Sequence, residues 1–208
     1  MNRKIIGNIL ILLGLLLIAA AAALVVQNVM AQEEAETSAQ QVLVQLEIPE
    51  VTVPAAKENE APVPVQIPDY QLNPRMPMPE TVIDGVAYIG TLEIPELELN
   101  LPIISTTTKA NLRIAPCRYE GSAYLDNLVI GAHNYDAHFG RLKTLSYGDE
   151  ISVVDLDGNV FVYEVADMEI LQPHQTEDLV GSDWPLTLYT CTVGGQTRVV
   201  IRCDKKTG

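Results

Sequence analysis

The hydrophobic and polar positions divide this 208-residue chain into stretches with different periodicities. Residues 5–26 form a run of 22 residues without a charged side chain. At 1.5 Å per residue this run spans about 33 Å as a helix, enough to cross the hydrocarbon core of a bilayer. Residues 27–80 are polar and proline-rich, whereas residues 81–208 carry short apolar runs separated by turn residues. The pattern predicts a short N-terminus (1–4), a transmembrane anchor, a linker and a folded domain.

Charges beside the apolar run predict its orientation. Arg3 and Lys4 precede the run, and Glu33 and Glu34 follow it. Because basic flanks stay in the cytoplasm, the domain is expected outside the cell on a single-pass membrane anchor. Residues 29–31, Val-Met-Ala, resemble a signal-peptide cleavage site, so a cleaved signal peptide is the alternative. The run exceeds the roughly 7–15 apolar residues of a signal peptide, which favours a retained anchor.

The segment 27–80 has the composition of a spacer rather than of a folded unit. It holds eight of the thirteen prolines of the chain. Such segments favour extended geometry and contribute little to a hydrophobic core. Residues 42–53 are more apolar and are compatible with a transient strand or short helix. The sequence therefore predicts an acidic, proline-rich, semi-rigid linker that holds the domain away from the membrane.

The domain that starts near residue 81 is expected to be mainly β-structure. Apolar runs bounded by turn residues indicate strands at residues 86–94, 97–103, 128–132, 150–156, 160–166, 186–191 and 197–203. Residues 157–159, Asp-Gly-Asn, are a strong hairpin signal. Short helices are expected at 109–115, 140–144 and 176–180. Many short strands favour a closed or nearly closed β-barrel over a parallel sheet.

Net charge narrows the set of partners. The chain carries −14 overall, and residues 81–208 contribute −9 of it. A domain this acidic has no basic stripe for a phosphate backbone, so no nucleic acid partner is expected. The same acidity disfavours tight docking on an anionic lipid surface.

Three cysteines, Cys117, Cys191 and Cys203, limit the covalent chemistry. An odd number outside the cell leaves at least one thiol that is free or pairs between molecules. A disulfide between Cys117 and Cys203 is possible in that compartment, but sequence does not show whether their Cα atoms are close enough. No Cys or His cluster has metal-site spacing, so neither a metal nor a cofactor is expected.

Cys191 and His133 are the candidate reactive side chains. Cys191 ends an apolar run, and its thiolate would be a nucleophile presented at a strand end. The alternative is that it is a small buried hydrophobic residue. His133 ends a short apolar run at the start of a polar loop, where it could protonate a leaving group. The alternative is an ordinary loop histidine, which is the expectation for His138 and His174.

An arginine is expected beside the cysteine. Arg198 follows Cys191 across a turn that contains Gly194 and Gly195, so a hairpin brings the two residues together. Its guanidinium could hold a substrate carbonyl or an oxyanion. Arg202 shares the face of Arg198 and competes for the role. Arg198 is preferred because it lies nearer the turn and the cysteine.

Taken together, these residues resemble the sortase family of Gram-positive cysteine transpeptidases. Residues 187–191, Thr-Leu-Tyr-Thr-Cys, match the strand end that carries the family's cysteine. Residues 131–134, Gly-Ala-His-Asn, match the setting of its histidine, and Arg198 precedes an apolar strand as the family's arginine does. Residues 89–95, Ile-Gly-Thr-Leu-Glu-Ile-Pro, match a segment near the start of its domain. The resemblance covers roughly residues 85–205.

The resemblance implies an eight-stranded sortase-like β-barrel with a few short helices, whose catalytic residues are Cys191, Arg198 and His133. Thr190 and Asn134, beside the catalytic residues, are expected to contact substrate. The implied reaction cleaves an LPxTG-like sorting signal at the C-terminus of a surface protein. It then joins that protein, through a thioester, to an amine of the peptidoglycan precursor or wall.

Other readings fit less well. Papain-like enzymes place the cysteine before the histidine, the reverse of the order here. L,D-transpeptidases, another wall-directed class, keep a histidine within a few residues of the cysteine, and Cys191 has none. A membrane-anchored β-barrel that only binds is the non-enzymatic alternative. Within the sortases, the pilin-building class usually has a second membrane helix near the C-terminus, so a chain that ends at Gly208 is expected to belong to another class.

Overall fold

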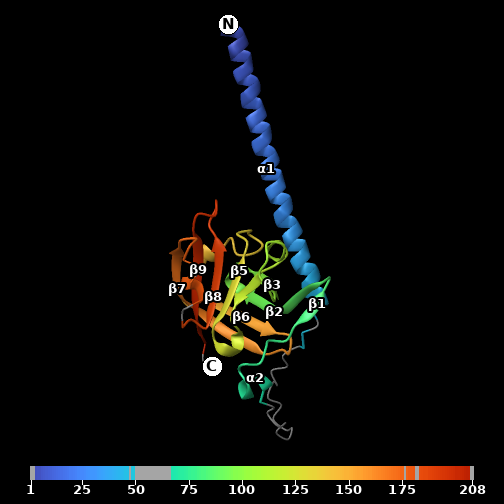
Figure 1. The fold of residues 1–208 in the computed structure, drawn as a ribbon, viewed down its shortest axis with the longest axis vertical. Helices are drawn as coiled ribbons and strands as arrows, with labels where there is room; N and C mark the ends of the chain where they lie inside the picture. The colour runs from blue at the N-terminus through green and yellow to red at the C-terminus, as the bar shows by residue number, and fades with distance from the viewer. Residues whose placement is uncertain (1–2, 47, 50–66, 176, 181–182, 207–208) are drawn as a thin grey trace.

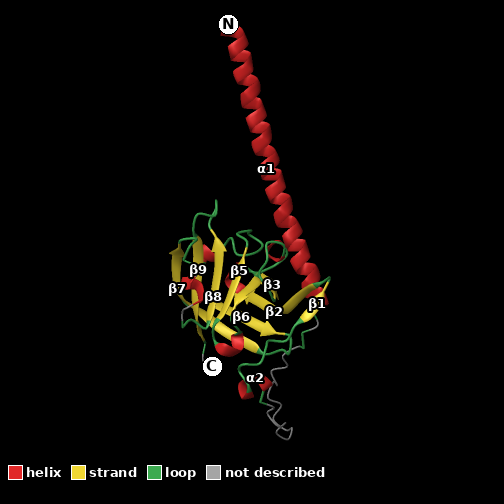
Figure 2. Ribbon diagram, viewed as in Figure 1, coloured by secondary structure: helices red, strands yellow, loops and turns green. Residues whose placement is uncertain are grey.

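The computed structural model describes residues 3–46, 48–49, 67–175, 177–180 and 183–206. A long N-terminal helix, α1 (Arg3–Gln45), runs past one side of a β-barrel and projects far beyond it (Figure 1). Strands make up the body of the barrel, and the helices around it are short (Figure 2). The chain begins at the free end of α1, and its last described residues lie toward the opposite end of the barrel.

The barrel is a closed ring of strands within the described residues. Its members are β2 (Val86–Ile94), β3 (Leu99–Ile104), β4 (Cys117–Glu120), β5 (Leu128–Ala132), β6 (Glu150–Asp155), β7 (Val160–Leu171), β8 (Leu186–Cys191) and β9 (Arg198–Lys205). Their order is β2-β3-β4-β5-β8-β9-β7-β6, and β6 pairs back with β2. A short strand, β1 (Thr81–Ile83), extends β2 as a hairpin outside the ring. The eight-stranded barrel expected from the sequence is confirmed.

Two of the pairings in this ring are parallel, β3 with β4 and β5 with β8. The other pairs are antiparallel. A parallel pair needs a long crossover connection, and the crossover from β5 to β8 contains β6, β7 and a short helix, α3 (Glu177–Val180). The strands next to the candidate histidine and cysteine are therefore neighbours, although 53 residues lie between the end of β5 and the start of β8.

Sequence patterning found most of the elements. The short strands β1 and β4 were missed, since each has only three or four residues and little apolar periodicity. The single-turn 3₁₀ helices η2 (Asn111–Arg113) and η4 (Leu142–Thr144), and α3, lie in three segments expected to be helical. Further short helices that were not expected are α2 (Asp69–Leu72), η1 (Pro95–Leu97) and η3 (Ala123–Leu125).

The expected hairpin at residues 157–159 connects β6 to β7. A buried carboxylate, Asp155, accepts hydrogen bonds from the backbone N–H groups of Asp157 and Asn159 at 3.0 and 2.8 Å. Gly158 sits in the turn with φ +82°, a conformation that L side chains rarely adopt. The Tyr124 hydroxyl donates to the same carboxylate at 2.6 Å, so the turn is tied to the far side of the barrel.

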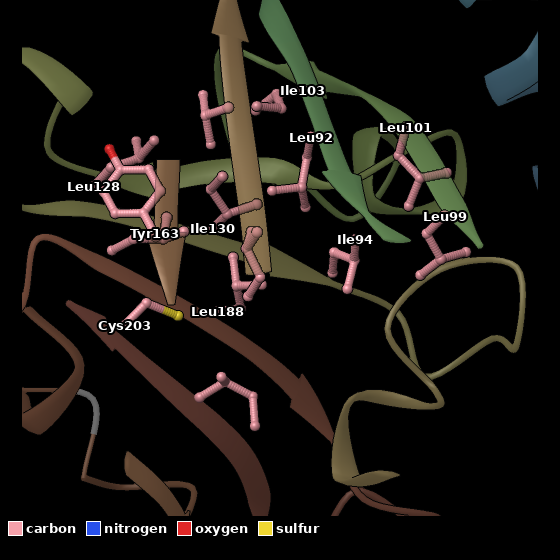
Figure 3. Close-up of a cluster of buried hydrophobic side chains, with 14 of the residues drawn as sticks. Leu92, Ile94, Leu99, Leu101, Ile103, Leu128, Ile130, Tyr163, Leu188 and Cys203 are labelled. Carbon is pink, nitrogen blue, oxygen red and sulfur yellow. The ribbon is translucent and has the colours of Figure 1, made fainter. Parts of the chain in front are cut away.

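Inward-pointing side chains fill the barrel. Leu92, Ile103, Ile130, Leu188 and Tyr163 come from five different strands and are each 3% exposed or less (Figure 3). Because side chains alternate across a strand, every second residue of β5, β8 and β9 enters this core and the intervening residues face outward. The barrel is a packed interior rather than a channel.

Helix α1 differs from the expected spacer. It continues through Gln45, well past the apolar run, because residues 27–46 contain helix-favouring Ala, Gln and Glu and no proline. Ala35, Ala39, Val42 and Leu46 recur on one helical face and are 9% exposed or less. Ala39, Val42 and Leu46 pack against residues of the barrel strands. The expected extended spacer is therefore wrong for residues 27–45, and most residues of the proline-rich part lie outside the described residues.

Replacing a core residue beside the candidate histidine tests the packing. Ile130→Ala removes buried methylene groups from β5 and should lower the free energy of unfolding by about 2–5 kcal/mol. Chemical unfolding in detergent, followed by tryptophan fluorescence, measures the change. The matched control is Ile170→Ala on β7, where the side chain is 59% exposed and a change within about 0.5 kcal/mol is expected. Equal losses in both variants would contradict the assigned core.

Candidate active site

Strand register brings three candidate side chains together at one end of the barrel. In the parallel pair, Ala132 of β5 lies opposite Thr190 of β8. The next residues along these strands are His133 and Cys191, so they leave the sheet side by side. In the antiparallel pair, Cys191 lies opposite Arg198, the first residue of β9. Neighbouring strands lie about 4.8 Å apart, so the three residues stand in a row across three adjacent strands.

All three side chains belong to the outer face of the barrel. The inner face of these strands presents Leu188 and Ile201, which are fully buried in the core. Cys191 and Arg198 alternate with those residues and therefore point outward. His133, Cys191 and Arg198 are each partly exposed. A reagent or peptide can therefore reach the row from outside without entering the core.

Two further predicted site residues flank the row. Thr190 is 3% exposed, and its hydroxyl donates a 2.9 Å hydrogen bond to the Ala132 carbonyl on β5. This bond joins the two strands one residue before His133 and Cys191, which favours a positioning role for Thr190. Asn134 follows His133 and is half-buried in the loop. Substrate contact by Thr190 and Asn134 stays a prediction.

The loop after β5 folds back on His133. The Phe139 N–H donates to the His133 carbonyl at 3.1 Å, and the Phe139 ring is fully buried in the core. The rings of His133 and Tyr135 lie 5.0 Å apart. Burial and, to a lesser degree, the positive charge of Arg113 lower the pKa of His133 from its ordinary value. The imidazole is therefore biased toward its neutral form when no substrate is present.

His138 was expected to be an ordinary loop histidine, and the structure places it differently. It is fully buried, with its ring 5.7 Å from that of Tyr135. Burial lowers its pKa to about 4, with a contribution from His133. A neutral, buried His138 is thus part of the packed interior of the loop that follows His133. No signal in the sequence distinguished it from an exposed histidine.

A glycine on β5 leaves room for a tyrosine ring next to Cys191. Gly131 on β5 lies opposite Tyr189 on β8, and the Tyr189 ring covers the place where a Cβ on Gly131 would stand. The ring of Tyr119 meets Tyr189 edge-on at 5.6 Å. A side chain at position 131 would push the tyrosine away, since its ring would overlap the new Cβ. Sequence analysis did not assign a role to Tyr189 or Gly131.

The turn between β8 and β9 holds Arg198. Gly194 and Gly195 have φ values of +82° and +70°, which explains the need for glycine at these positions. The Nη1 atom of Arg198 donates to the carbonyls of Gly195 and Thr197 at 3.1 and 3.0 Å. Both bonds are made within the turn, which keeps the guanidinium beside the strand end that carries Cys191.

Arg202, the competing arginine, is committed elsewhere. It is 3% exposed and forms an ion pair with Glu169 of β7 at 2.7 Å. It also donates to the Thr187 hydroxyl at 3.1 Å and to the Asp178 carbonyl of α3 at 2.5 Å. These contacts fasten α3 to the outer face of the sheet, away from the row. Of the two arginines, Arg198 is the one that lies opposite Cys191, and its catalytic role stays a prediction.

The other two cysteines are free and inaccessible. Cys117 lies on β4 and Cys203 on β9, and β5 and β8 separate these strands. Cys203 belongs to the barrel core (Figure 3), whereas Cys117 packs in a separate cluster with Val42 and Leu46 at the end of α1. Burial raises the pKa of Cys117 to about 12 and that of Cys203 further still. The disulfide considered from the sequence is absent, and Cys191 is the exposed thiol of the three.

Comparison with known families agrees with this geometry. Residues 92–206 match the family model described as Sortase domain. This match covers more than half of the chain, so the protein belongs to the sortase family. Membership implies transpeptidase activity. A search among curated proteins returned no match.

Solved structures give the same answer at the level of fold. Sortase C1 of Streptococcus suis is 26% identical with a TM-score of 0.51, over 58% of this chain and 74% of that one. Sortase C1 of Streptococcus agalactiae is 26% identical with a TM-score of 0.53, over 61% and 72%. Sortase C of Clostridium perfringens SM101, at 24% identity, shares the fold with a TM-score of 0.51, over 69% and 77%.

These similar structures are sortase C enzymes, and two other matches are described as enzymes of pilus systems. The expectation that this chain belongs to a class other than the pilin-building one therefore gains no support from the comparisons. The class stays a prediction.

The charge of Arg113 offers a test of His133. Arg113→Gln should raise the pKa of His133, because it removes a positive charge that disfavours the imidazolium, while burial keeps part of the lowering. The limb of the kcat/KM profile set by His133 should move to higher pH. An NMR titration of the imidazole measures the same shift directly.

Lys206→Gln is the control, since Lys206 pairs with Glu150 at 2.7 Å, remote from the row. A His133 pKa that does not change in Arg113→Gln, or that changes equally in Lys206→Gln, would contradict the assigned electrostatics.

Proposed function

We propose that the row of His133, Cys191 and Arg198 is the catalytic centre of a membrane-anchored sortase, which cleaves an LPxTG-like sorting signal. The observation that carries this proposal is the register: Cys191 opposite Arg198, and His133 one step beyond the Ala132–Thr190 pair. A nucleophile, a cation and a proton donor meet on one outward face although they come from distant parts of the sequence. Family membership supports the same reading.

In the first half of the reaction, the neutral His133 imidazole accepts the proton of the Cys191 thiol, and the resulting thiolate attacks the carbonyl carbon of the Thr–Gly bond. A tetrahedral intermediate forms, and its oxyanion lies toward the Arg198 guanidinium. Collapse of the intermediate breaks the C–N bond, and His133 donates a proton to the departing glycine amine. A thioester between the threonine carbonyl and Cys191 remains.

In the second half, an amine of the peptidoglycan precursor or wall attacks the thioester. The new amide bond forms, the C–S bond breaks, and Cys191 leaves as a thiolate. His133 accepts the proton that the attacking amine loses and passes it to the Cys191 thiolate, which restores the neutral imidazole and the thiol. The products are a surface protein joined to the wall amine and a free enzyme.

The site environment supports this division of roles. Burial and Arg113 lower the pKa of His133, so the residue releases its proton readily to a leaving amine. Arg198 lies on the strand neighbour of Cys191, and its planar guanidinium can donate to two oxygens at once. The remaining thiols, Cys117 and Cys203, are buried and keep their protons at neutral pH.

We further propose that α1 is a retained membrane anchor with its N-terminus in the cytoplasm. Its apolar part is a candidate membrane span with a mean hydropathy of 3.2, and this part of the helix is not buried against the barrel. Arg3 and Lys4 lie on the expected cytoplasmic side. The catalytic domain is then extracellular, where surface proteins and wall precursors are found.

Removing the nucleophile tests the first half of the reaction. Cys191→Ala should abolish cleavage of pentapeptides from a library and leave no enzyme–acyl adduct by intact mass, with the fold unchanged by circular dichroism. Cys117→Ala is the matched control, because that thiol is buried and should not react. A thioester adduct on the Cys191→Ala variant would show that another residue is the nucleophile.

Exchanging the two arginines for lysine separates catalysis from structure. Arg198→Lys keeps the charge but loses the guanidinium fork, and kcat should fall on the order of 10²–10³. Arg202→Lys should instead lower stability, roughly 1–3 kcal/mol, because the buried contacts to Glu169, Thr187 and α3 are weakened. Its rate per folded molecule should stay within a few-fold of wild type.

Steady-state kinetics normalised to the thiol-titrated active fraction, together with thermal unfolding, measure both effects. A larger loss of kcat in Arg202→Lys than in Arg198→Lys would move the oxyanion role to Arg202.

A further inference from the structure

The direction in which the catalytic end of the barrel faces is set by α1. Along this helix, Ala31, Glu34 and Ser38 line a cavity together with Arg113 and Tyr135. Tyr135 follows His133 by two residues, and Arg113 is the charge that acts on His133. The helix therefore passes the loops of the candidate active site about one to three turns after leaving its apolar part.

The opposite end of the barrel meets α1 later in the chain. Gln45 and Leu46 line a cavity with Leu156 and Asp157, which belong to the β6–β7 hairpin. The contacts along α1 thus run from the catalytic end to the hairpin end as the helix leaves the apolar run. Figure 1 shows the same arrangement: the β8–β9 turn and the loop after β5 lie at the end of the barrel nearest the N-terminal part of α1.

Helix geometry converts these positions into a height. The apolar run ends at Val26, and the residues beside the active-site loops are Ala31 to Ser38. At 1.5 Å per residue they lie about 8–18 Å along the axis from the edge of the hydrocarbon core. Head groups occupy roughly 5–8 Å on each side of that core. The active-site loops therefore lie at the outer edge of the head groups or just beyond it.

The helix has no residue typical of a kink or hinge between the apolar run and the segment that packs on the barrel. Residues 15–48 contain neither glycine nor proline, and α1 is continuous through Gln45. Ala39 and Val42 pack against the barrel, and Ala35, one turn earlier, is 1% exposed, so the helix is held over about two turns. Rotation of the barrel away from the membrane would have to break this packing or bend the helix.

The negative charge of the domain is compatible with a barrel whose active-site end faces the bilayer. The domain carries −9 over residues 81–208 and would be repelled by an anionic surface. The Debye length at physiological salt is about 8 Å, so the repulsion is largely screened at the height given above. One exposed apolar side chain lies in the β8–β9 turn at this end of the barrel: Val193 is 89% exposed.

We propose that α1 acts as a fixed spacer that turns the catalytic end toward the bilayer and selects membrane-tethered acyl donors by the height of their scissile bond. The proposal rests on the proposed function and concerns how α1 limits the reach of the active site. An extended chain covers about 3.4 Å per residue, so a height of 8–18 Å corresponds to roughly 2–6 residues between the scissile bond and the membrane segment of the donor. A donor bond held much closer to, or farther from, the bilayer meets the active site less often.

The test changes the height without turning the barrel. An insertion of 18 helix-forming residues after Asn28, where α1 is exposed, adds five full turns and raises the catalytic end by roughly 27 Å. The matched control carries a Gly/Ser insertion of the same length at the same place, which is flexible and lets the barrel return to the surface.

Full-length enzyme variants are placed in phosphatidylglycerol-containing vesicles with three probes. Each probe carries the pentapeptide selected in the library screen. One is tethered to a membrane helix by a spacer of about four residues, one by about fourteen, and the third is a free peptide. Cleavage is followed by mass spectrometry.

The helical insertion should reduce cleavage of the short-spacer probe at least tenfold. Cleavage of the long-spacer and free probes should stay within about threefold, and the Gly/Ser insertion should recover most of the loss. Cleavage of the short-spacer probe at the wild-type rate by the helical-insertion variant overturns the spacing proposal and leaves the proposed function intact. Loss of α1 by processing, seen as release from the vesicles, also overturns it. Failure of wild type to cleave any probe, the free peptide included, overturns the proposed function itself.

Discussion

The parallel pairing of β5 with β8 is the constraint on which the rest of the site depends. It sets Ala132 opposite Thr190, and the Thr190 hydroxyl bonds to the Ala132 carbonyl at 2.9 Å. One residue further along each strand, His133 and Cys191 emerge together. A shift of this register by one residue would send one of the two side chains into the barrel, because successive side chains point to opposite faces. The chemistry thus rests on an ordinary feature of β-structure.

The alternation of inward and outward side chains along the strands also determines the accessibility of each cysteine. Cys203 points inward and is part of the packed core, whereas Cys191 points outward at a strand end. Cys117 also lies outside the core, but α1 covers it, and burial raises its pKa to about 12. Three residues of the same type therefore have different reactivities, since reactivity follows access and the cost of forming a buried thiolate.

Helix α1 joins the candidate membrane span to the side of the barrel. Its apolar part suits a bilayer, and its later part carries small side chains that let it pack closely on the barrel. Ala35 and Ala39 allow the helix axis to approach β3 and the loops at the catalytic end, which longer side chains would hold apart. The candidate membrane span and the segment that packs on the barrel consequently belong to one continuous helix.

The sequence alone determined the properties that depend on near neighbours in the chain. These are the apolar run of residues 5–26, the turn at Asp157 to Asn159, most strands of the barrel, and the motifs around His133 and Cys191. Composition gave a wrong prediction for residues 27–45, because a helix and the proline-rich segment after it were treated as one spacer. The spacing of Ala35, Ala39, Val42 and Leu46 is that of a buried helical face.

Tertiary structure alone decided the strand order, the burial of His138 and Arg202, and the packing of α1 along the side of the barrel. Each of these depends on pairings and contacts between residues far apart in the chain, for which local periodicity carries no signal.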